Sequence, residues 1–232
     1  MKMLEVDGIY TEIDQKVLLE DISFSIDSGS AMALVGHNGA GKSTLIKTIL
    51  GILEKSKGTI TVNNHSIDES YIPYKEHISY LPEEPLLLTE LTAMQHFQLY
   101  GLSYDLPEKI LGERIDRYVK GFELEGKLDV YPESLSKGMR QKVQAICAFL
   151  PDIPLLLIDE PFMGLDVYAI DYMEQLIREK IDQGTSILLT THQLDKVKRI
   201  AGSFIMLEQG KLIEEGRMEE FNTITRSSGA NG

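Results

Sequence analysis

The sequence contains a single cysteine, Cys147, among its 232 residues. One thiol cannot form an internal disulfide or share a metal ion with a second thiol, so a disulfide-stabilised protein and a thiolate metal site are excluded. This shortage fits the reducing cytosol. We expect Cys147 to be a core residue, because free cysteines are among the most buried residue types.

A long apolar run is also missing, since no stretch approaches the roughly 18 uninterrupted apolar residues typical of a membrane-spanning helix. Glu5 and Asp7 interrupt the start of the chain, where a signal peptide needs a long apolar stretch. We therefore expect a cytoplasmic chain that neither crosses nor enters a membrane.

Positive charge is scarce, with 23 Lys and Arg against 36 Asp and Glu and a formal net charge of −13. Such a surface repels the phosphates of nucleic acids and anionic lipid headgroups, so no nucleic-acid partner is expected. Hydrophobic residues make up 43% of the chain. This content, at this length, is enough to bury a core, and the composition is not that of a disordered protein.

Alternating and β-branched apolar residues in the first part of the chain predict strands over residues 4–9, 17–26 and 59–62, with a hairpin turn at Asn63-Asn64. Short, fully apolar runs predict buried parallel strands at residues 31–35, 155–158 and 186–190. Helices are expected at about 42–50 and 167–181, and a final hairpin around Gln209-Gly210. Strand and helix alternating in this way predict an α/β fold with a mostly parallel sheet.

The middle of the chain, residues 89–150, has a different character. Thr92 and Gln95 have the spacing of a capping box at the start of a helix. Apolar residues further on have the i, i+3, i+4, i+7 spacing of a buried helix face: Val143, Ile146, Cys147 and Leu150. The sequence therefore predicts a helical lobe between the strands.

A glycine-rich segment between a predicted strand and a predicted helix matches the phosphate-binding pattern G-x-x-x-x-G-K-[ST]. Its glycines let successive backbone N–H groups curl around an anion, and the helix N-terminus adds partial positive charge. We expect Lys42 to reach the β- and γ-phosphates of a nucleotide and the Ser43 hydroxyl to bind Mg²⁺. The predicted nucleotide-binding residues of this loop are Gly36, His37, Asn38, Gly39, Ala40, Gly41, Lys42, Ser43 and Thr44.

Two adjacent acids, Asp159 and Glu160, follow the apolar strand 155–158. Ligands bind at the carboxyl ends of strands in open α/β sheets, and burying two carboxylates without a cation is costly. We assign Asp159 to a Mg²⁺ ion, through a water, and Glu160 to orienting and deprotonating the water that attacks the γ-phosphate. The alternative is an exposed strand end without function. With the loop above, the acids predict a P-loop NTPase.

Further motifs narrow the class of NTPase. Leu135-Ser-Lys-Gly-Met-Arg-Gln141 precedes the acids, and Gly164-Leu-Asp166 and Thr191-His192 follow them. In this order and spacing, the set resembles the ATP-binding subunits of ABC transporters over residues 1–220, and most of all bacterial exporters of the ABC-2 and Ecs type. The resemblance implies a RecA-like P-loop core with a mostly parallel sheet, an N-terminal antiparallel β subdomain and an inserted helical subdomain. It places the core and β subdomain at about 1–88 and 151–220 and the helical subdomain at about 89–150, and residues 221–232 are expected to be a disordered tail.

The resemblance also implies an ATPase that works as a head-to-tail homodimer or heterodimer with ATP between the subunits. Ser136, Lys137 and Gly138 would then contact the ATP held by the partner subunit, and Asp166 would cross the dimer interface. The alternative for Ser136 and Asp166 is an ordinary helix N-cap, and for Asp166 both roles are compatible. His192 would hydrogen-bond the γ-phosphate, although a lone histidine at a strand end is usually a satisfied polar residue.

Two positions depart from the family pattern. Glu83 stands where most members have a glutamine that contacts Mg²⁺, and a carboxylate can fill that role. Ile13 stands at the usual position of the aromatic residue that stacks on adenine, with Tyr10 three residues earlier. We expect either Ile13 to pack weakly on the base or Tyr10 to reach it.

By the same resemblance, a transmembrane permease subunit would hold this chain at the inner face of the cell membrane. A short cytoplasmic helix of the permease would dock beyond Glu83, near Phe97, Tyr100 and Tyr104, although aromatic residues in a helical block are more often core residues. The short stretch after Gly216 favours export, because some importers append a regulatory domain there. Two other functions stay open: a soluble ATPase of an assembly complex, for example for iron-sulfur clusters, and a nucleotide sensor with little turnover.

Overall fold

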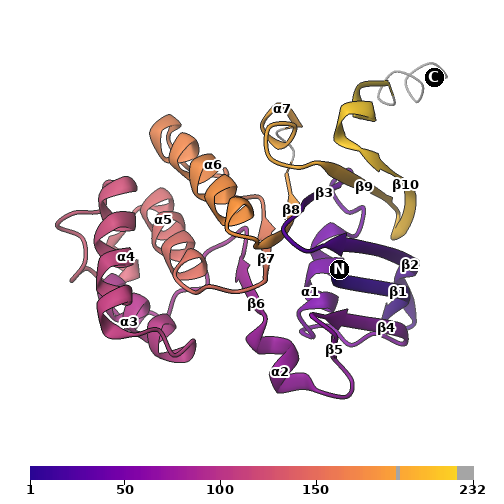
Figure 1. The fold of residues 1–232 in the computed structure, drawn as a ribbon, viewed down its shortest axis with the longest axis horizontal. Coiled ribbons are helices and arrows are strands. Elements are labelled where there is room, and N and C mark those ends of the chain that lie inside the picture. The colour runs from indigo at the N-terminus through magenta and orange to yellow at the C-terminus, as the bar shows by residue number, and fades with distance from the viewer. Residues whose placement is uncertain (192–193, 224–232) are drawn as a thin grey trace.

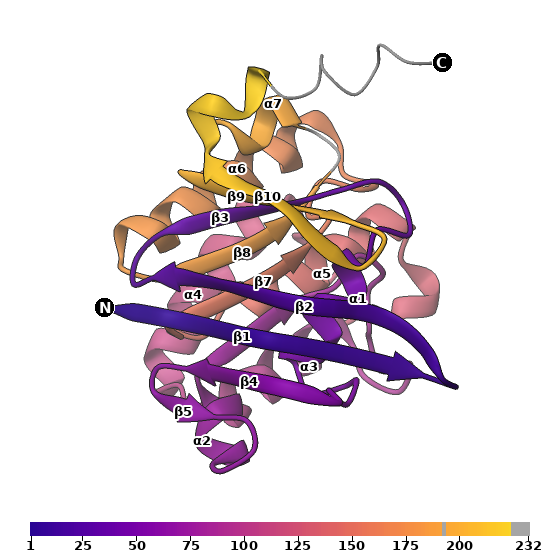
Figure 2. The same cartoon turned by 90° about the vertical axis from the view of Figure 1, so that its right-hand side faces the viewer.

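A computed structural model describes residues 1–191 and 194–223. Its strands form two sheets, with strand orders β2-β1-β4-β5 and β10-β9-β3-β8-β7-β6 (Figures 1 and 2). Three helices, α3, α4 and α5, gather to one side, away from the antiparallel strands (Figure 1). None of the helices in the described part of the chain combines the length and the apolar character needed to cross a membrane.

The first sheet is antiparallel and is built mainly by the N-terminal third of the chain. Its strands are β1 (Lys2–Ile13), β2 (Lys16–Asp27), β4 (Lys57–Val62) and β5 (His65–Ser66). Asn63 and Asn64 link β4 to β5 with φ values of 48° and 64°, the left-handed conformation of a two-residue hairpin turn. The predicted β-rich start and its hairpin are confirmed.

The second sheet holds the short apolar runs of the sequence. Its strands are β3 (Ala31–Val35), β6 (Ile78–Leu81), β7 (Leu155–Asp159), β8 (Ser186–Thr190), β9 (Ser203–Glu208) and β10 (Lys211–Arg217). All neighbours pair in parallel except β9 and β10, which form the predicted hairpin. Every residue of β3, β7 and β8 is buried, which explains why these strands show no polar alternation.

The helices cover the two sheets and build the lobe predicted for the middle of the chain. They are α1 (Lys42–Ile49), α2 (Tyr71–Glu76), α3 (Ala93–Ser103), α4 (Glu108–Gly121), η1 (Pro132–Ser134), α5 (Lys137–Phe149), α6 (Val167–Asp182), α7 (Leu194–Val197) and η2 (Met218–Thr223). The inner face of α1 shares one core cluster with strands of both sheets. In η2, Phe221 is buried against Phe204. The rest of the expected tail, residues 224–232, lies outside the described residues.

The helical signals in the sequence are confirmed at residue level. Thr92 and Gln95 form both hydrogen bonds of the capping box at the start of α3. Val143, Ile146, Cys147 and Leu150 are all fully buried. Burial raises the pKa of the Cys147 thiol. Cys147 is therefore an inert core residue, as predicted.

The elements that escape the sequence patterns include α2 and β6. They contain 6 and 4 residues, too few to show a helical or a strand period, and α2 carries a proline. Both matter for the site, since β6 leads directly into Glu83. Strand β6 lies at the edge of the parallel sheet beside β7, so Glu83 is delivered next to the end of the strand that carries Asp159.

Candidate functional site

The glycine-rich loop joins β3 to α1 in the predicted strand–loop–helix arrangement. At Gly36, with φ 154°, an added Cβ would lie 2.5 Å from the carbonyl oxygen of Leu207. At Gly41, with φ 110°, the added atom would lie 3.1 Å from the side chain of Leu19. The positive φ at both positions strains any residue with a side chain, and at Gly36 the neighbouring backbone also leaves no space for one. The loop is held between the end of β9 and the start of β2.

The side chain of Lys42 bends back over the loop. Its ammonium donates to the carbonyl oxygens of Gly36 at 2.8 Å and His37 at 3.2 Å. Burial lowers the pKa of Lys42, while the negative charges of Glu160 and Asp159 act in the opposite direction. The Lys42 ammonium is thus hydrogen-bonded to the phosphate loop and lies close to Asp159 and Glu160.

A pocket of about 380 Å³ opens in front of this loop and brings together residues from distant parts of the sequence. Its lining residues are Leu18, Asn38, Gly39, Gly41, Lys42, Ser43, Thr44, Glu83, Asp159 and Glu160. The phosphate loop and all three predicted acids therefore share one cavity. In nucleotide sites, Mg²⁺ is usually bound by one or two carboxylates together with the phosphates of the substrate. The pocket offers carboxylates and a hydroxyl beside the phosphate-binding loop. The donor set fits a Mg²⁺–nucleotide complex.

Asp159 and Glu160 are fixed by Thr190 at the end of the neighbouring strand β8. The Thr190 hydroxyl donates to Asp159 Oδ1 at 2.5 Å and accepts from the Glu160 backbone N–H at 3.0 Å. All three residues are buried. Glu160 has φ 49°, a conformation that a side chain seldom adopts and that often marks a functional site. Sequence analysis missed Thr190 as a site residue, although it ends a predicted strand next to the acids.

The Ser136 segment begins α5 and lies outside the lining of this pocket. The Ser136 hydroxyl accepts from the backbone N–H of Met139 at 3.2 Å, so its role as a helix N-cap is confirmed. The Lys137 ammonium pairs with Glu84 at 2.6 Å, directly after Glu83. Ser136 and Lys137 are exposed. Ser136 and Lys137 can therefore be reached by a second molecule, although they do not line this chain's own pocket.

Asp166 lies at the start of α6 and makes two polar contacts. It accepts from the backbone N–H of Ala169 at 2.9 Å, which confirms the predicted N-cap, and pairs with Lys142 of α5 at 2.8 Å. Its hydrogen bond to Lys142 is the main cause that lowers the pKa of Asp166. Close by, an added Cβ at Gly138 would lie 2.7 Å from the carbonyl oxygen of Gly164.

Several predicted residues do not line the pocket, among them Gly36, His37 and Ala40 of the loop. Among the described residues that line it, the apolar contact comes from Leu18, whereas neither Ile13 nor Tyr10 takes part. Ile13 is exposed at the end of β1, and Lys57 lies over the ring of Tyr10 at 5.0 Å from its centroid. His192 lies outside the described residues. Contacts of Ile13 and Tyr10 with a base therefore stay a prediction.

A second hollow, of about 700 Å³, lies between α2, β6 and the helical lobe. Its walls include Tyr80, Pro82, Leu86, Tyr100 and Tyr104. Phe97 is instead fully buried in the core. Phe97 is thus a core residue, whereas the docking of a permease against Tyr100 and Tyr104 stays a prediction. Tyr100 and Tyr104 face the hollow, and Tyr104 also donates to the carbonyl oxygen of Ile78 at 2.9 Å.

Comparison with known proteins agrees with this geometry. The family model described as ABC transporter matches residues 19–163. The ABC-type transporter ATP-binding protein EcsA of Bacillus subtilis (strain 168) is 36% identical over 95% of this chain and 89% of its own length. The Nod factor export ATP-binding protein I of Sinorhizobium fredii is 33% identical over 92% of this chain and 62% of its own length. A solved structure described as an ATP-binding subunit of an ABC transporter has 38% identity and a TM-score of 0.91, covering 99% of this chain and 95% of that one.

Proposed function

Because this chain belongs to the ATP-binding subunits of ABC transporters, and is therefore an ATPase, we propose that it forms a dimer that closes on ATP and drives a membrane permease. The observation that carries the proposal is the shared pocket, in which the phosphate loop, Ser43 and three acids converge. The exposed Ser136 segment supports the need for a second subunit. Export is the direction we propose, since the similar proteins include one named for Nod factor export.

The phosphate loop would hold the triphosphate. Loop residues and the first residues of α1 line the pocket, so their backbone N–H groups would bind the phosphates, and Lys42 would exchange the carbonyls of Gly36 and His37 for the β- and γ-phosphates. Ser43, Asp159 and Glu83 would hold Mg²⁺, with Asp159 acting through a water. When bound, the ion neutralises charge on the phosphates.

Glu160 would orient and deprotonate the attacking water. Its backbone is fixed by Thr190, and the buried Glu160 lines the same pocket as Lys42, which supports a place for its carboxylate near the γ-phosphate. Phosphoryl transfer requires positioning and neutralisation of charge more than covalent chemistry. By family resemblance, His192 would help to hold Glu160 and the water in line.

A second ATP-binding subunit, identical or related, would complete each site. Ser136, Lys137 and Gly138 lie at the N-terminus of α5, where backbone N–H groups and partial positive charge favour an anion. Since this end of α5 does not line the chain's own pocket, it would act on the ATP of the partner. Asp166, on the adjoining loop, would then lie at the interface. A monomer would hydrolyse ATP slowly.

A permease would dock in the hollow beyond Glu83. This groove lies between the core and the helical lobe, and its aromatic and apolar walls suit a short amphipathic helix. The permease would hold this chain at the cytoplasmic face of the membrane. Movement between the lobes on ATP binding would reach the permease through that helix.

The test is a pull-down of the tagged chain from membranes of the source cell, with and without Mg²⁺-ATP. Co-purification of a polytopic membrane protein is the expected result. A second arm uses the Leu86→Asp, Tyr104→Asp variant, which changes two residues of the hollow. This variant should no longer co-purify with the membrane protein but should keep its ATPase activity. Recovery of soluble partners alone, with turnover intact, would favour an assembly-complex ATPase instead.

A further inference from the structure

The short segment 148–154 connects the two elements that carry the candidate site. It comprises the last two residues of α5, whose N-cap is Ser136, and the link from α5 to β7, whose end holds Asp159. Any change in the angle between α5 and β7 therefore moves the Ser136 segment relative to the two acids. What holds this segment in place is accordingly relevant to catalysis.

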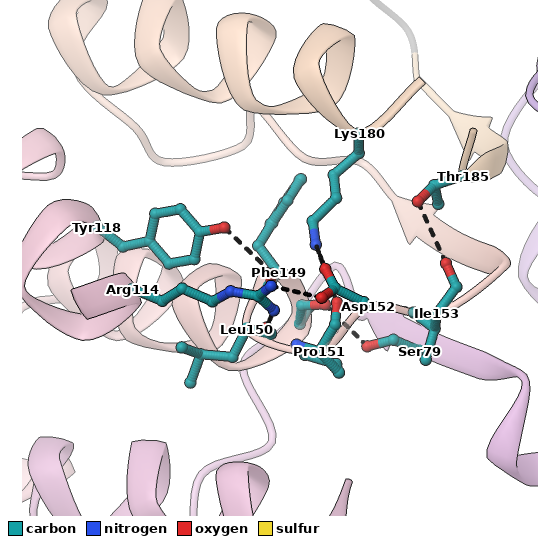
Figure 3. A network of polar contacts seen from close by, with 11 residues as sticks. Ser79, Arg114, Tyr118, Phe149, Leu150, Pro151, Asp152, Ile153, Lys180 and Thr185 are labelled. Carbon is teal, nitrogen blue, oxygen red and sulfur yellow. Dashed lines mark hydrogen bonds and ion pairs between the residues drawn. The ribbon is translucent and has the colours of Figure 1, made fainter. Parts of the chain in front are cut away.

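Side chains from several elements bind the backbone of this segment (Figure 3). The last carbonyl groups of a helix have no partners within the helix and must find others. Here the donors come from β6, α4, α6 and the residue before β8. The pairs are Ser79 with Ala148, Tyr118 with Phe149, Arg114 with Leu150, Lys180 with Pro151 and Thr185 with Ile153.

Asp152 joins two of these donors across the boundary between the helical lobe and the core. Its carboxylate pairs with Arg114 of α4 and, at 3.4 Å, with Lys180 of α6 (Figure 3). The Lys180 side chain is only 8% exposed. The Lys180 ammonium is held by the Pro151 carbonyl oxygen at 2.9 Å and by the Asp152 carboxylate, which is itself 63% exposed and also pairs with Arg114.

A second ion pair supports the same boundary. Arg117, one turn after Arg114 on α4, pairs with Glu179, the neighbour of Lys180 on α6. The Tyr172 ring packs edge-on against Phe122 nearby, with centroids 4.9 Å apart. Helices α4 and α6 are thus joined beside the segment, and the segment is held between them.

We propose that Arg114, Asp152 and Lys180 are positioning residues that fix α5 relative to β7 and so hold Ser136 and Gly138 where a second subunit can use them. The three residues lie at the C-terminal end of α5, a full helix length from Ser136, so they act through α5 and not on the nucleotide. A small rotation at this end is converted by the helix into a larger displacement of its N-terminus. The inference rests on the proposed function, because it assigns Ser136 to the ATP of a partner subunit.

The experiment compares Asp152→Asn with its parent in a Glu160→Gln background, in which we expect ATP to be bound but hydrolysed slowly. Sedimentation velocity with Mg²⁺-ATP gives the protein concentration at which half of the chain is dimeric. We expect Asp152→Asn to raise that concentration by at least about fivefold, the size of effect typical of coupled contacts. The affinity of the monomer for a fluorescent ATP analogue should stay within about twofold, because no residue of the phosphate pocket is changed.

Two variants separate positioning from simple loss of stability. Asp152→Glu keeps the carboxylate and should restore most of the dimerisation. Lys109→Gln removes an exposed ion pair within α4, to Glu113 at 3.9 Å, and should have no effect. A merely structural role would lower the melting temperature without shifting the dimerisation of the folded chain. Should Asp152→Asn fail to fold, Arg114→Lys, which keeps the charge, takes its place.

A second measurement does not depend on dimerisation. Spin labels at Glu133→Cys in η1 and Asp171→Cys in α6 report the distance between lobe and core in the monomer, and Cys147 is too buried to be labelled. We expect one narrow distance distribution in the parent and a broader or shifted one in Asp152→Asn. If Asp152→Asn shows the same distance distribution and the same dimerisation as the Lys109→Gln control, the inference is wrong. If the parent itself does not dimerise with ATP, the proposed function fails, and the label distances still decide whether these residues hold the lobe.

Discussion

The Lys142 ammonium lies 2.8 Å from Asp166 Oδ2, which links the middle of α5 to the N-terminus of α6. The Lys142 side chain is 10% exposed, so the pair is screened from water on one side. Close by, the backbones of Gly138 and Gly164 approach so tightly that a Cβ at Gly138 has no room. The Ser136 segment and the loop after Glu160 are therefore joined by direct contacts into one unit.

Breaking this pair should uncouple that unit. We expect Lys142→Met and Asp166→Asn each to lower ATP turnover while leaving monomer nucleotide affinity unchanged, because neither residue lines the phosphate pocket. In a double-mutant cycle on unfolding by urea, the two changes should be non-additive by about 0.5–1 kcal/mol, since one partner is largely exposed. If the effects of the two changes on turnover and on stability are strictly additive, the Lys142–Asp166 contact does not couple α5 to α6.

Lys42→Ala should weaken ATP binding about 100-fold. The change removes the ammonium that the loop holds beside the acids, and losing one partner of a buried charged contact costs about 3 kcal/mol, or about 100-fold in affinity. Titration with a fluorescent ATP analogue measures this directly. Lys47→Ala, an exposed lysine on the same helix, is the matched control and should bind normally. Unchanged affinity in Lys42→Ala would refute the assignment of the phosphate loop.

Glu160→Gln should keep ATP binding and lower turnover by at least about 100-fold, the usual contribution of a general base. The amide keeps the size of the side chain but cannot take a proton. ATP hydrolysis under steady-state conditions and the sedimentation of the ATP complex are the two measurements, and the variant should accumulate as a dimer. Glu215→Gln on β10 is the exposed control. Normal turnover in Glu160→Gln would mean that another group is the base.

Thr190→Val should damage both stability and catalysis. Valine has the shape of threonine but leaves a buried carboxylate oxygen of Asp159 without its donor and removes one acceptor from the Glu160 N–H. We expect the free energy of unfolding to fall by about 1–3 kcal/mol, as for other unsatisfied buried groups, and turnover to fall with it. Urea unfolding and an ATPase assay measure the two effects. Thr59→Val on the exposed side of β4 should change neither, and equal behaviour of the two variants would contradict the role of Thr190.

The ion pairs of Asp152 should appear in the pH dependence of stability. Burial acts to raise the pKa of Asp152, but Arg114 and Lys180 outweigh it and hold the pKa below its ordinary value of 3.8. A carboxyl with a lowered folded-state pKa stabilises the fold above its unfolded value, and this contribution is lost as the pH falls through the folded value. The difference in unfolding free energy between the natural chain and Asp152→Asn should thus be constant from pH 7 to 5 and shrink below 3.8. Urea unfolding at several pH values tests this, and a constant difference down to pH 3 would contradict it.

Sequence patterns predicted the features of the molecule that depend on residues close together in the chain. The phosphate loop is one continuous segment whose geometry is made by its own backbone, so nine adjacent residues were enough to identify it. The buried strands β3, β7 and β8 were visible as apolar runs because both faces of a parallel sheet are covered. The N-caps Ser136 and Asp166 and the Thr92 capping box depend on hydrogen bonds only three residues apart, and all three are present.

Contacts between distant segments were decided only by the tertiary structure. Thr190 reaches Asp159 because β7 and β8 are neighbours in the sheet, and Glu84 reaches Lys137 because the helical lobe packs beside the end of β6. The Arg114–Asp152–Lys180 group needs α4, segment 148–154 and α6 to meet at one point. A hydrogen bond or ion pair acts over a few ångströms, and no spacing along the chain specifies which distant side chains will come that close. The sequence by itself therefore determined the family and the phosphate-binding chemistry, whereas the packing of the lobes decided which residues hold that chemistry in place.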